Sequence, residues 1–272
     1  MGAVELSVGD LDRTLDYWQR AIGLRLLSRD NGRASLGTDT ELVRFVEEPG
    51  ARPADGLTGL YHVALLLPDR PSLARWLAHA ARDRVALEGL SDHNVSEAIY
   101  LRDPDRHGIE IYADRPRERW QGRVTELMAT LPLDVESLFG ELGDPAREPF
   151  DGLPDGTRVG HVHLRVADVQ PIVGFYRDVV GLDLMAQLGP MAAFLSAGGY
   201  HHHVGANTWE SRGAPPGGPG VATLRHATIV LPTAEERDRV AARVADSGQE
   251  PEEREGGLFV RDPSQNPILL SV

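Results

Sequence analysis

Two histidines and a glutamate in this sequence could together hold a metal ion. His62 lies in the alternating run Tyr61–Leu67, and His161 lies in a similar run, Gly160–Val166. Glu110 lies in a later apolar run. Two imidazoles and one carboxylate can occupy one face of a metal ion and leave other positions open, an arrangement suited to oxygen chemistry at non-haem Fe(II). The sequence therefore predicts a half-open metal site.

Each of these residues also has a purely structural explanation. A histidine in an apolar strand is often a core residue whose polar atom finds one hydrogen-bond partner. Two features favour metal binding instead. The histidine recurs at position 161, and burying the carboxylate of Glu110 without a cation would be costly.

Composition narrows the classes of function. The chain has 272 residues, 41% hydrophobic and 25% charged, which is typical of a globular protein with two domains or one large one. The net charge of −13 argues against nucleic acid or an anionic membrane as the main partner. The absence of cysteine excludes disulfides, Cys-ligated zinc and iron–sulfur sites. No apolar run approaches the roughly 18 residues of a membrane span and no signal peptide is evident, so we expect a cytoplasmic location.

The elements that must position these residues form an internal repeat. An alternating strand, an amphipathic helix and three short strands recur along the chain, an α+β pattern. In the first copy, Asp10 can cap the helix and Gly23 can end it. We expect two copies in residues 1–115 and two in residues 158–272, joined by a connecting segment at 116–157. The four units cover residues 1–50 (unit one), 57–115 (unit two), 158–211 (unit three) and 222–272 (unit four).

These units carry a family resemblance. An aspartate followed by an aromatic pair in the first and third helices, and Asp-Pro followed by Ile-Glu at the end of unit two, resemble the vicinal oxygen chelate superfamily. That superfamily includes glyoxalase I, bleomycin-resistance proteins, fosfomycin-resistance enzymes and type I extradiol dioxygenases. The resemblance covers the whole chain. More narrowly, Ser91–Asp105, Gly160–Val166 and Ser196–Trp209 are similar to bacterial catechol 2,3-dioxygenases with four units.

The resemblance implies where metal ligands should lie. In this superfamily, paired βαβββ units form open, β-barrel-like clefts, with ligands on the first strand of each unit and a carboxylate on the last strand. Here the last-strand carboxylate remains as Glu110, whereas Leu269 takes its place in unit four. The first-strand positions are Ala3, His62, His161 and His226.

This distribution favours one pairing of the units. If unit one paired with two and unit three with four, neither cleft would hold two histidines and a carboxylate. Pairing of unit two with unit three gathers His62, Glu110 and His161, so we expect that arrangement. A competing site would combine His161, His226 and one residue of His201–His203, with His202 as an alternative ligand.

Several further residues could move protons. His93 follows Asp92 in a loop, and imidazole titrates near neutral pH. The three consecutive histidines lie in a predicted strand, Tyr200–Gly205, where alternation would place His201 and His203 on one face and His202 on the other. Tyr112 shares a face with the glutamate two residues earlier and could hydrogen-bond a substrate oxygen.

The resemblance implies a metal-dependent extradiol dioxygenase that cleaves a small catechol-like aromatic diol with dioxygen. Fe(II) is the expected metal, with Mn(II) or Zn(II) as alternatives. A glyoxalase-type lyase or isomerase would use the same scaffold, but the histidine-rich cleft argues against it. A non-catalytic, drug-binding protein would need no ligand triad. We expect no nucleic-acid or membrane partner, and base rates admit a homo-oligomer.

Overall fold

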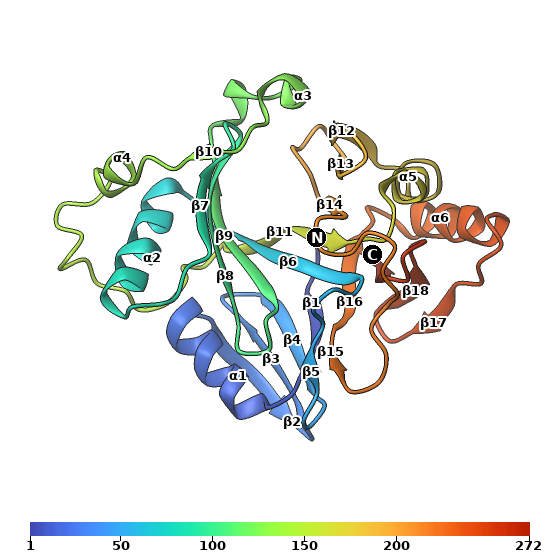
Figure 1. Ribbon diagram of the computed structural model, residues 1–272, viewed down its shortest axis with the longest axis horizontal. Coiled ribbons are helices and arrows are strands. Elements are labelled where there is room, and N and C mark those ends of the chain that lie inside the picture. The colour runs from blue at the N-terminus through green and yellow to red at the C-terminus, as the bar shows by residue number, and fades with distance from the viewer.

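Each unit folds as one strand, one helix and three further strands (Figure 1). The computed structural model describes residues 1–272. Unit one contains β1 (Val4–Val8), α1 (Leu11–Tyr17), β2 (Arg25–Asp30), β3 (Arg33–Gly37) and β4 (Glu41–Glu47). Unit two contains β6 (Gly59–Leu66), α2 (Arg70–Arg82), β7 (Gly89–Asp92), β8 (Ser96–Arg102) and β9 (Gly108–Asp114).

The second half repeats this order. Unit three contains β11 (Arg158–Arg165), α5 (Val169–Gly174), β12 (Asp183–Leu188), β13 (Ala192–Ser196) and β14 (Val204–Asn207). Unit four contains β16 (Leu224–Val230), α6 (Ala234–Asp246), β17 (Glu252–Arg254), β18 (Gly257–Arg261) and β19 (Pro267–Ser271). The connecting segment contains α3 (Val124–Leu127), β10 (Leu131–Pro132) and α4 (Val135–Phe139), and the short strands β5 (Arg52–Pro53) and β15 (Val221–Ala222) pair with each other.

Local sequence explains the bounds of the helices in units one and three. The side chains of Asp10 and Asp168 accept backbone hydrogen bonds of 2.9 and 3.0 Å at the two N-termini. Both helices continue into a wider π-helical turn and end at Gly23 and Gly181. These glycines have φ values of 91° and 95°, a left-handed conformation that glycine adopts without a steric penalty.

The last strand of unit three begins later than predicted. β14 starts at Val204, and the three histidines at 201–203 lie in the preceding loop. Gly198 and Gly199 both have left-handed φ values, 63° and 66°, and form a turn that extends this loop. The prediction of a strand over these three histidines is therefore wrong.

Two large sheets each combine one unit from either half of the chain. The nine-stranded sheet has the order β10-β7-β8-β9-β6-β11-β14-β13-β12, and the eight-stranded sheet has the order β17-β18-β19-β16-β1-β4-β3-β2. Antiparallel pairs join the units at the centre of each sheet, β6 with β11 and β1 with β16. Unit two thus pairs with unit three, and unit one with unit four, as the ligand pattern favours.

Within every unit, the first strand lies parallel to the last. This holds for β6 with β9, β11 with β14, β1 with β4 and β16 with β19. Buried apolar side chains from all four units form one continuous core between the sheets and helices. No helix is both long and apolar enough to span a membrane.

The close approach of β6 and the start of β9 yields a test of this architecture. A Cβ added at Gly108 would lie 1.9 Å from the carbonyl oxygen of Tyr61 and 3.1 Å from Cβ of His62. We expect Gly108→Ala to lower the free energy of unfolding by roughly 1–3 kcal/mol, because the two strands must separate. Gly143→Ala is the control, since nothing lies within 4 Å of its added Cβ. Equal stability of the two variants in urea titrations would contradict the packing described here.

Candidate metal centre and substrate cavity

Three neighbouring strands bring the predicted metal ligands together. β6 lies between β9 and β11, and Ala64 of β6 stands opposite Glu110 on one side and His161 on the other. His62 lies two residues before Ala64 and therefore on the same face of the sheet. The register of the central strands thus directs all three side chains toward one point.

The donor atoms of this triad are close together and buried. Nε2 of His62 lies 2.9 Å from Oε2 of Glu110, and Nε2 of His161 lies 3.1 Å from the same oxygen. The two Nε2 atoms are 3.4 Å apart, and the three residues are 1–5% exposed. They form a group whose ligand atoms all lie within 4.8 Å of one another.

The electrostatics of the triad suit a cation. Burial lowers the pKa of His161 to about 4, against the opposing effect of Glu110, so this imidazole is neutral near pH 7. Burial raises the pKa of Glu110, but His161 and His62 outweigh it and hold the pKa well below its usual value. A buried, ionised carboxylate beside neutral imidazole is the protonation state that binds metal, and a divalent cation would compensate its charge. These residues therefore fit a metal ion.

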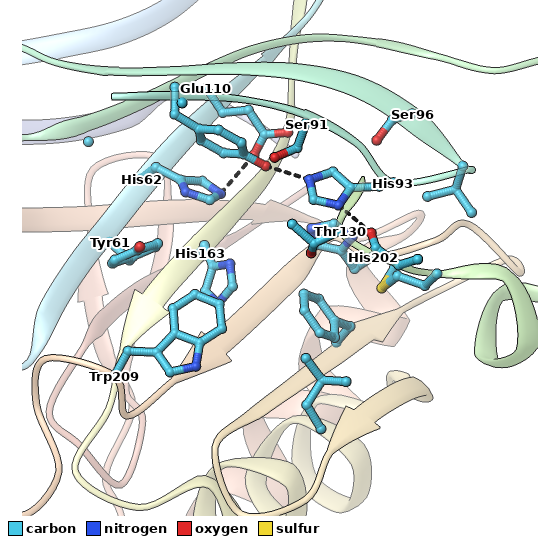
Figure 2. A pocket seen from close by; sticks show the side chains of 18 of the residues that line it. Tyr61, His62, Ser91, His93, Ser96, Glu110, Thr130, His163, His202 and Trp209 are labelled. Carbon is cyan, nitrogen blue, oxygen red and sulfur yellow. Dashed lines mark hydrogen bonds and ion pairs between the residues drawn. The ribbon is translucent and has the colours of Figure 1, made fainter. Parts of the chain in front are cut away.

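A cavity of about 470 Å³ opens beside the triad (Figure 2). His62, Glu110, His93, His163 and His202 contribute to its wall. The wall is largely apolar, and its large apolar side chains include Met128, Leu188, Phe194 and Trp209. A volume of this size with a few polar groups at one point is typical of a small-molecule site.

His93 and Tyr100 form a hydrogen-bonded pair on this wall. Nδ1 of His93 lies 2.6 Å from the carbonyl oxygen of Ala129, and its Nε2 lies 2.7 Å from the hydroxyl of Tyr100. A carbonyl can only accept, so Nδ1 carries the proton; in the neutral ring, Nε2 then accepts from the tyrosine. Burial, together with the charge of Glu110, raises the pKa of Tyr100 well above its usual value, so the residue remains a phenol.

Sequence reasoning did not single out Tyr100, although a signal for it exists. In the antiparallel pair of β8 and β9, Tyr100 stands directly opposite Glu110. The turn at Asp103-Pro104 lies between these strands, so their register could have been derived from the hairpin. His163 was also missed: it lies two residues after His161, which places both histidines on one face of β11.

The connecting segment also lines the cavity. Thr125, Met128, Ala129 and Thr130 all contribute to its wall. Two hydrogen bonds hold the segment there: Nδ1 of His93 donates to the carbonyl of Ala129, and Nδ2 of Asn94 donates to the carbonyl of Leu127 at 2.9 Å. The link between the two halves of the chain therefore closes one side of the cavity.

His202 lines the cavity, unlike the histidines on either side of it. Its Nδ1 lies 2.8 Å from Nδ1 of His201, and its ring centroid lies 3.9 Å from that of His161. Burial, together with the neighbouring His161 and His201, lowers the pKa of His202 well below its usual value. This residue is a neutral imidazole near pH 7.

Three predicted acid–base residues do not line the cavity. The hydroxyl of Tyr112, two positions after Glu110 on β9, lies 2.9 Å from that of Tyr200, and the ring centroid of Tyr112 lies 4.9 Å from that of His161. Nε2 of His201 binds Asp114 at 2.9 Å, and Nδ1 of His203 lies 2.9 Å from the hydroxyl of Ser196. In this geometry none of the three reaches a molecule in the cavity.

The competing three-histidine site is not assembled. His226 belongs to β16 in the eight-stranded sheet, whereas His161 belongs to β11 in the nine-stranded sheet. Thr228 of β16 stands opposite Leu269 of β19, just as Ala64 of β6 stands opposite Glu110 of β9. Leu269 therefore occupies the position beside His226 that corresponds to Glu110, and no carboxylate lies there. The nearest acidic group to this histidine is Glu5, with 3.9 Å between Nδ1 and Oε1.

Comparisons with known proteins agree with this geometry. The family model described as "Glyoxalase/Bleomycin resistance protein/Dioxygenase superfamily" matches residues 1–111 and 158–270. The chain is 43% identical over 280 residues to a catechol-2,3-dioxygenase of Bacillus subtilis strain 168, covering 100% of this chain and 96% of that protein. The crystal structure of glyoxalase I from Zea mays superposes with a TM-score of 0.63 at 18% identity, covering 99% of this chain and 91% of that one. The latter likeness concerns the fold alone.

The two clefts offer a paired test of metal binding. We expect Glu110→Ala to reduce the affinity for Fe(II) more than roughly a hundredfold, because the only anionic donor of the triad is lost. His226→Ala should bind as the parent does. Metal content after anaerobic dialysis, with circular dichroism to verify folding, measures both. Loss of metal in the His226 variant and retention in the Glu110 variant would place the site in the other cleft.

Proposed function

This chain belongs to the Glyoxalase/Bleomycin resistance protein/Dioxygenase superfamily, and we propose that it is a metal-dependent extradiol dioxygenase that opens the ring of a small catechol-like diol with dioxygen. The observation that carries the proposal is the convergence of His62, Glu110 and His161, of which His62 and Glu110 line a largely apolar cavity. The 43% identity to a catechol-2,3-dioxygenase over the whole chain supports the same reaction.

Fe(II) is the metal that this donor set favours. Two imidazole nitrogens and one carboxylate with open positions are characteristic of non-haem Fe(II) oxygenases, although the same donors accept Mn(II) or Zn(II). When bound, the metal would act as a Lewis acid that orients the diol and dioxygen and favours loss of a hydroxyl proton. His62, Glu110 and His161 would hold it.

The apolar wall positions the aromatic ring. Phe194 and Trp209 flank His163, with ring centroids 5.6 Å from that histidine in both cases. Met128, from the connecting segment, adds to the same cavity. These side chains bury the ring and exclude water, so that only the polar end beside the triad can accommodate the two hydroxyl groups.

Two groups can move protons at that polar end. The hydroxyl of Tyr100 can turn from His93 toward a substrate oxygen that becomes anionic, and His93 can then exchange a proton at Nε2. His202 is the second group that can accept a proton, because its Nδ1 contacts His201 and its Nε2 has no protein partner. As a neutral imidazole it can accept a substrate proton.

Oxygen uptake by protein loaded anaerobically with Fe(II) tests the reaction. With catechol or a methylcatechol we expect one dioxygen consumed per diol and a coloured, ring-opened product. The Glu110→Ala variant, treated in the same way, measures any oxygen uptake caused by iron that is free in solution. Verified iron binding without oxygen uptake would contradict the proposal and favour a lyase or isomerase on the same scaffold.

The pair His93–Tyr100 leads to a second test. We expect Tyr100→Phe to lower kcat by about 10²-fold with a small change in KM, because the phenol acts on charge that develops during the reaction. Tyr176→Phe is the control, since that tyrosine is buried, does not line the cavity, and has its hydroxyl 3.5 Å from Asp262. Steady-state oxygen consumption measures both, and equal kcat values would remove Tyr100 from the mechanism.

A further inference from the structure

A second cavity, of about 420 Å³, lies in the cleft between units one and four. It corresponds to the substrate cavity between units two and three, because β1 and β16 pair at its centre as β11 and β6 do in the other sheet. Its walls differ in chemistry. They are mainly polar, and the non-proline apolar side chains are Val46, Leu224 and Phe259.

This second cleft cannot reproduce the metal triad. Between β1 and β16, Glu5 stands opposite His226; between β11 and β6, His163 stands opposite His62. His226 therefore occupies the position in this sheet that His62 occupies in the other. The equivalent of Glu110 is Leu269. One ligand of the three therefore remains, and no other group of His or carboxylate donors converges in this cleft.

Guanidinium groups dominate the wall instead. Arg33 pairs with Glu5 at 3.5 Å, Arg254 pairs with Glu252 at 2.6 Å, and Arg225 pairs with Glu48. Arg261 has no carboxylate partner, and its Nη1 donates to the carbonyl of Gln265 at 2.9 Å. The four lining arginines thus exceed the three carboxylates that neutralise them. This excess stands out in a protein whose net charge is −13.

The arginines also retain unused hydrogen-bond donors. A guanidinium carries five N–H groups, and a single carboxylate accepts two of them at most. The guanidinium carbon of Arg254 lies 3.4 Å from the ring centroid of Phe259, and that of Arg261 lies 5.1 Å from it, so one buried ring supports both groups. In addition, Nε2 of His226 is buried in this wall and has no hydrogen-bond partner.

We propose that the second cleft binds a small polyanion, whose carboxylate or phosphate groups contact Arg254, Arg261 and His226. Fork-like guanidinium donors match both kinds of oxyanion, and the excess positive charge disfavours a metal cation. The mainly polar wall also distinguishes this ligand from the aromatic diol of the other cavity. The two clefts of the duplicated fold would then recognise ligands of different chemistry.

Calorimetric titration tests this second site. The full-length chain, prepared without added metal so that chelation is not measured, is titrated with pyrophosphate and with propane-1,2,3-tricarboxylate at an ionic strength held constant with sodium chloride. We expect one saturable site for at least one of the probes. Tighter binding of pyrophosphate would identify phosphate as the recognised group, and tighter binding of the tricarboxylate would identify carboxylate.

Matched variants locate the site. Arg254→Gln and Arg261→Gln should each weaken binding about tenfold or more, because a charge-assisted donor is lost. Both arginines are exposed, so these variants should fold. Arg177→Gln is the control, since this exposed arginine also pairs with a neighbouring carboxylate, Asp178. Absence of saturable binding, or equal affinity of all three variants, would overturn the proposal.

Discussion

The candidate active site depends on one buried charge, the carboxylate of Glu110. It lies between two imidazoles in the centre of a sheet, where an unpaired charge is costly. The parallel pairing of β6 with β9 places it there, and the antiparallel pairing of β6 with β11 adds the histidine from the other half of the chain. A cation at this point would compensate the charge and would thereby link the stability of the sheet centre to the chemistry of the site.

The same architecture produces two clefts with different contents. In one sheet the central strands carry His62, His161 and Glu110, and apolar and aromatic side chains surround them. In the other sheet Leu269 and Ala3 occupy equivalent ligand positions, and arginines surround the remaining histidine. Repetition of a unit thus preserved the backbone, whereas the side chains at a few strand positions decided what each cleft can bind.

The connecting segment has a structural role that its composition did not reveal. Its residues 125–130 close the cavity, and the carbonyl of Ala129 holds His93 in the tautomer that can accept from Tyr100. Side chains of unit two hold it there: His93 and Asn94 bind carbonyls of the segment, and Arg70 binds Glu141 at 2.6 Å. Such contacts leave little trace in a sequence, because the paired residues lie far apart in the chain.

The sequence by itself determined the four βαβββ units, the three triad residues and, through the loss of a carboxylate at Leu269, the pairing of the units. These properties follow from periodicity and from residue types that chemistry requires at set strand positions. Only the tertiary structure decided which of His201, His202 and His203 reaches the cavity, because the sequence does not show which side of this segment faces it. It also replaced Tyr112 with Tyr100 beside the triad and brought together the arginines of the second cleft. Those outcomes depend on register, loop path and contacts between residues far apart in the chain, which local patterns do not encode.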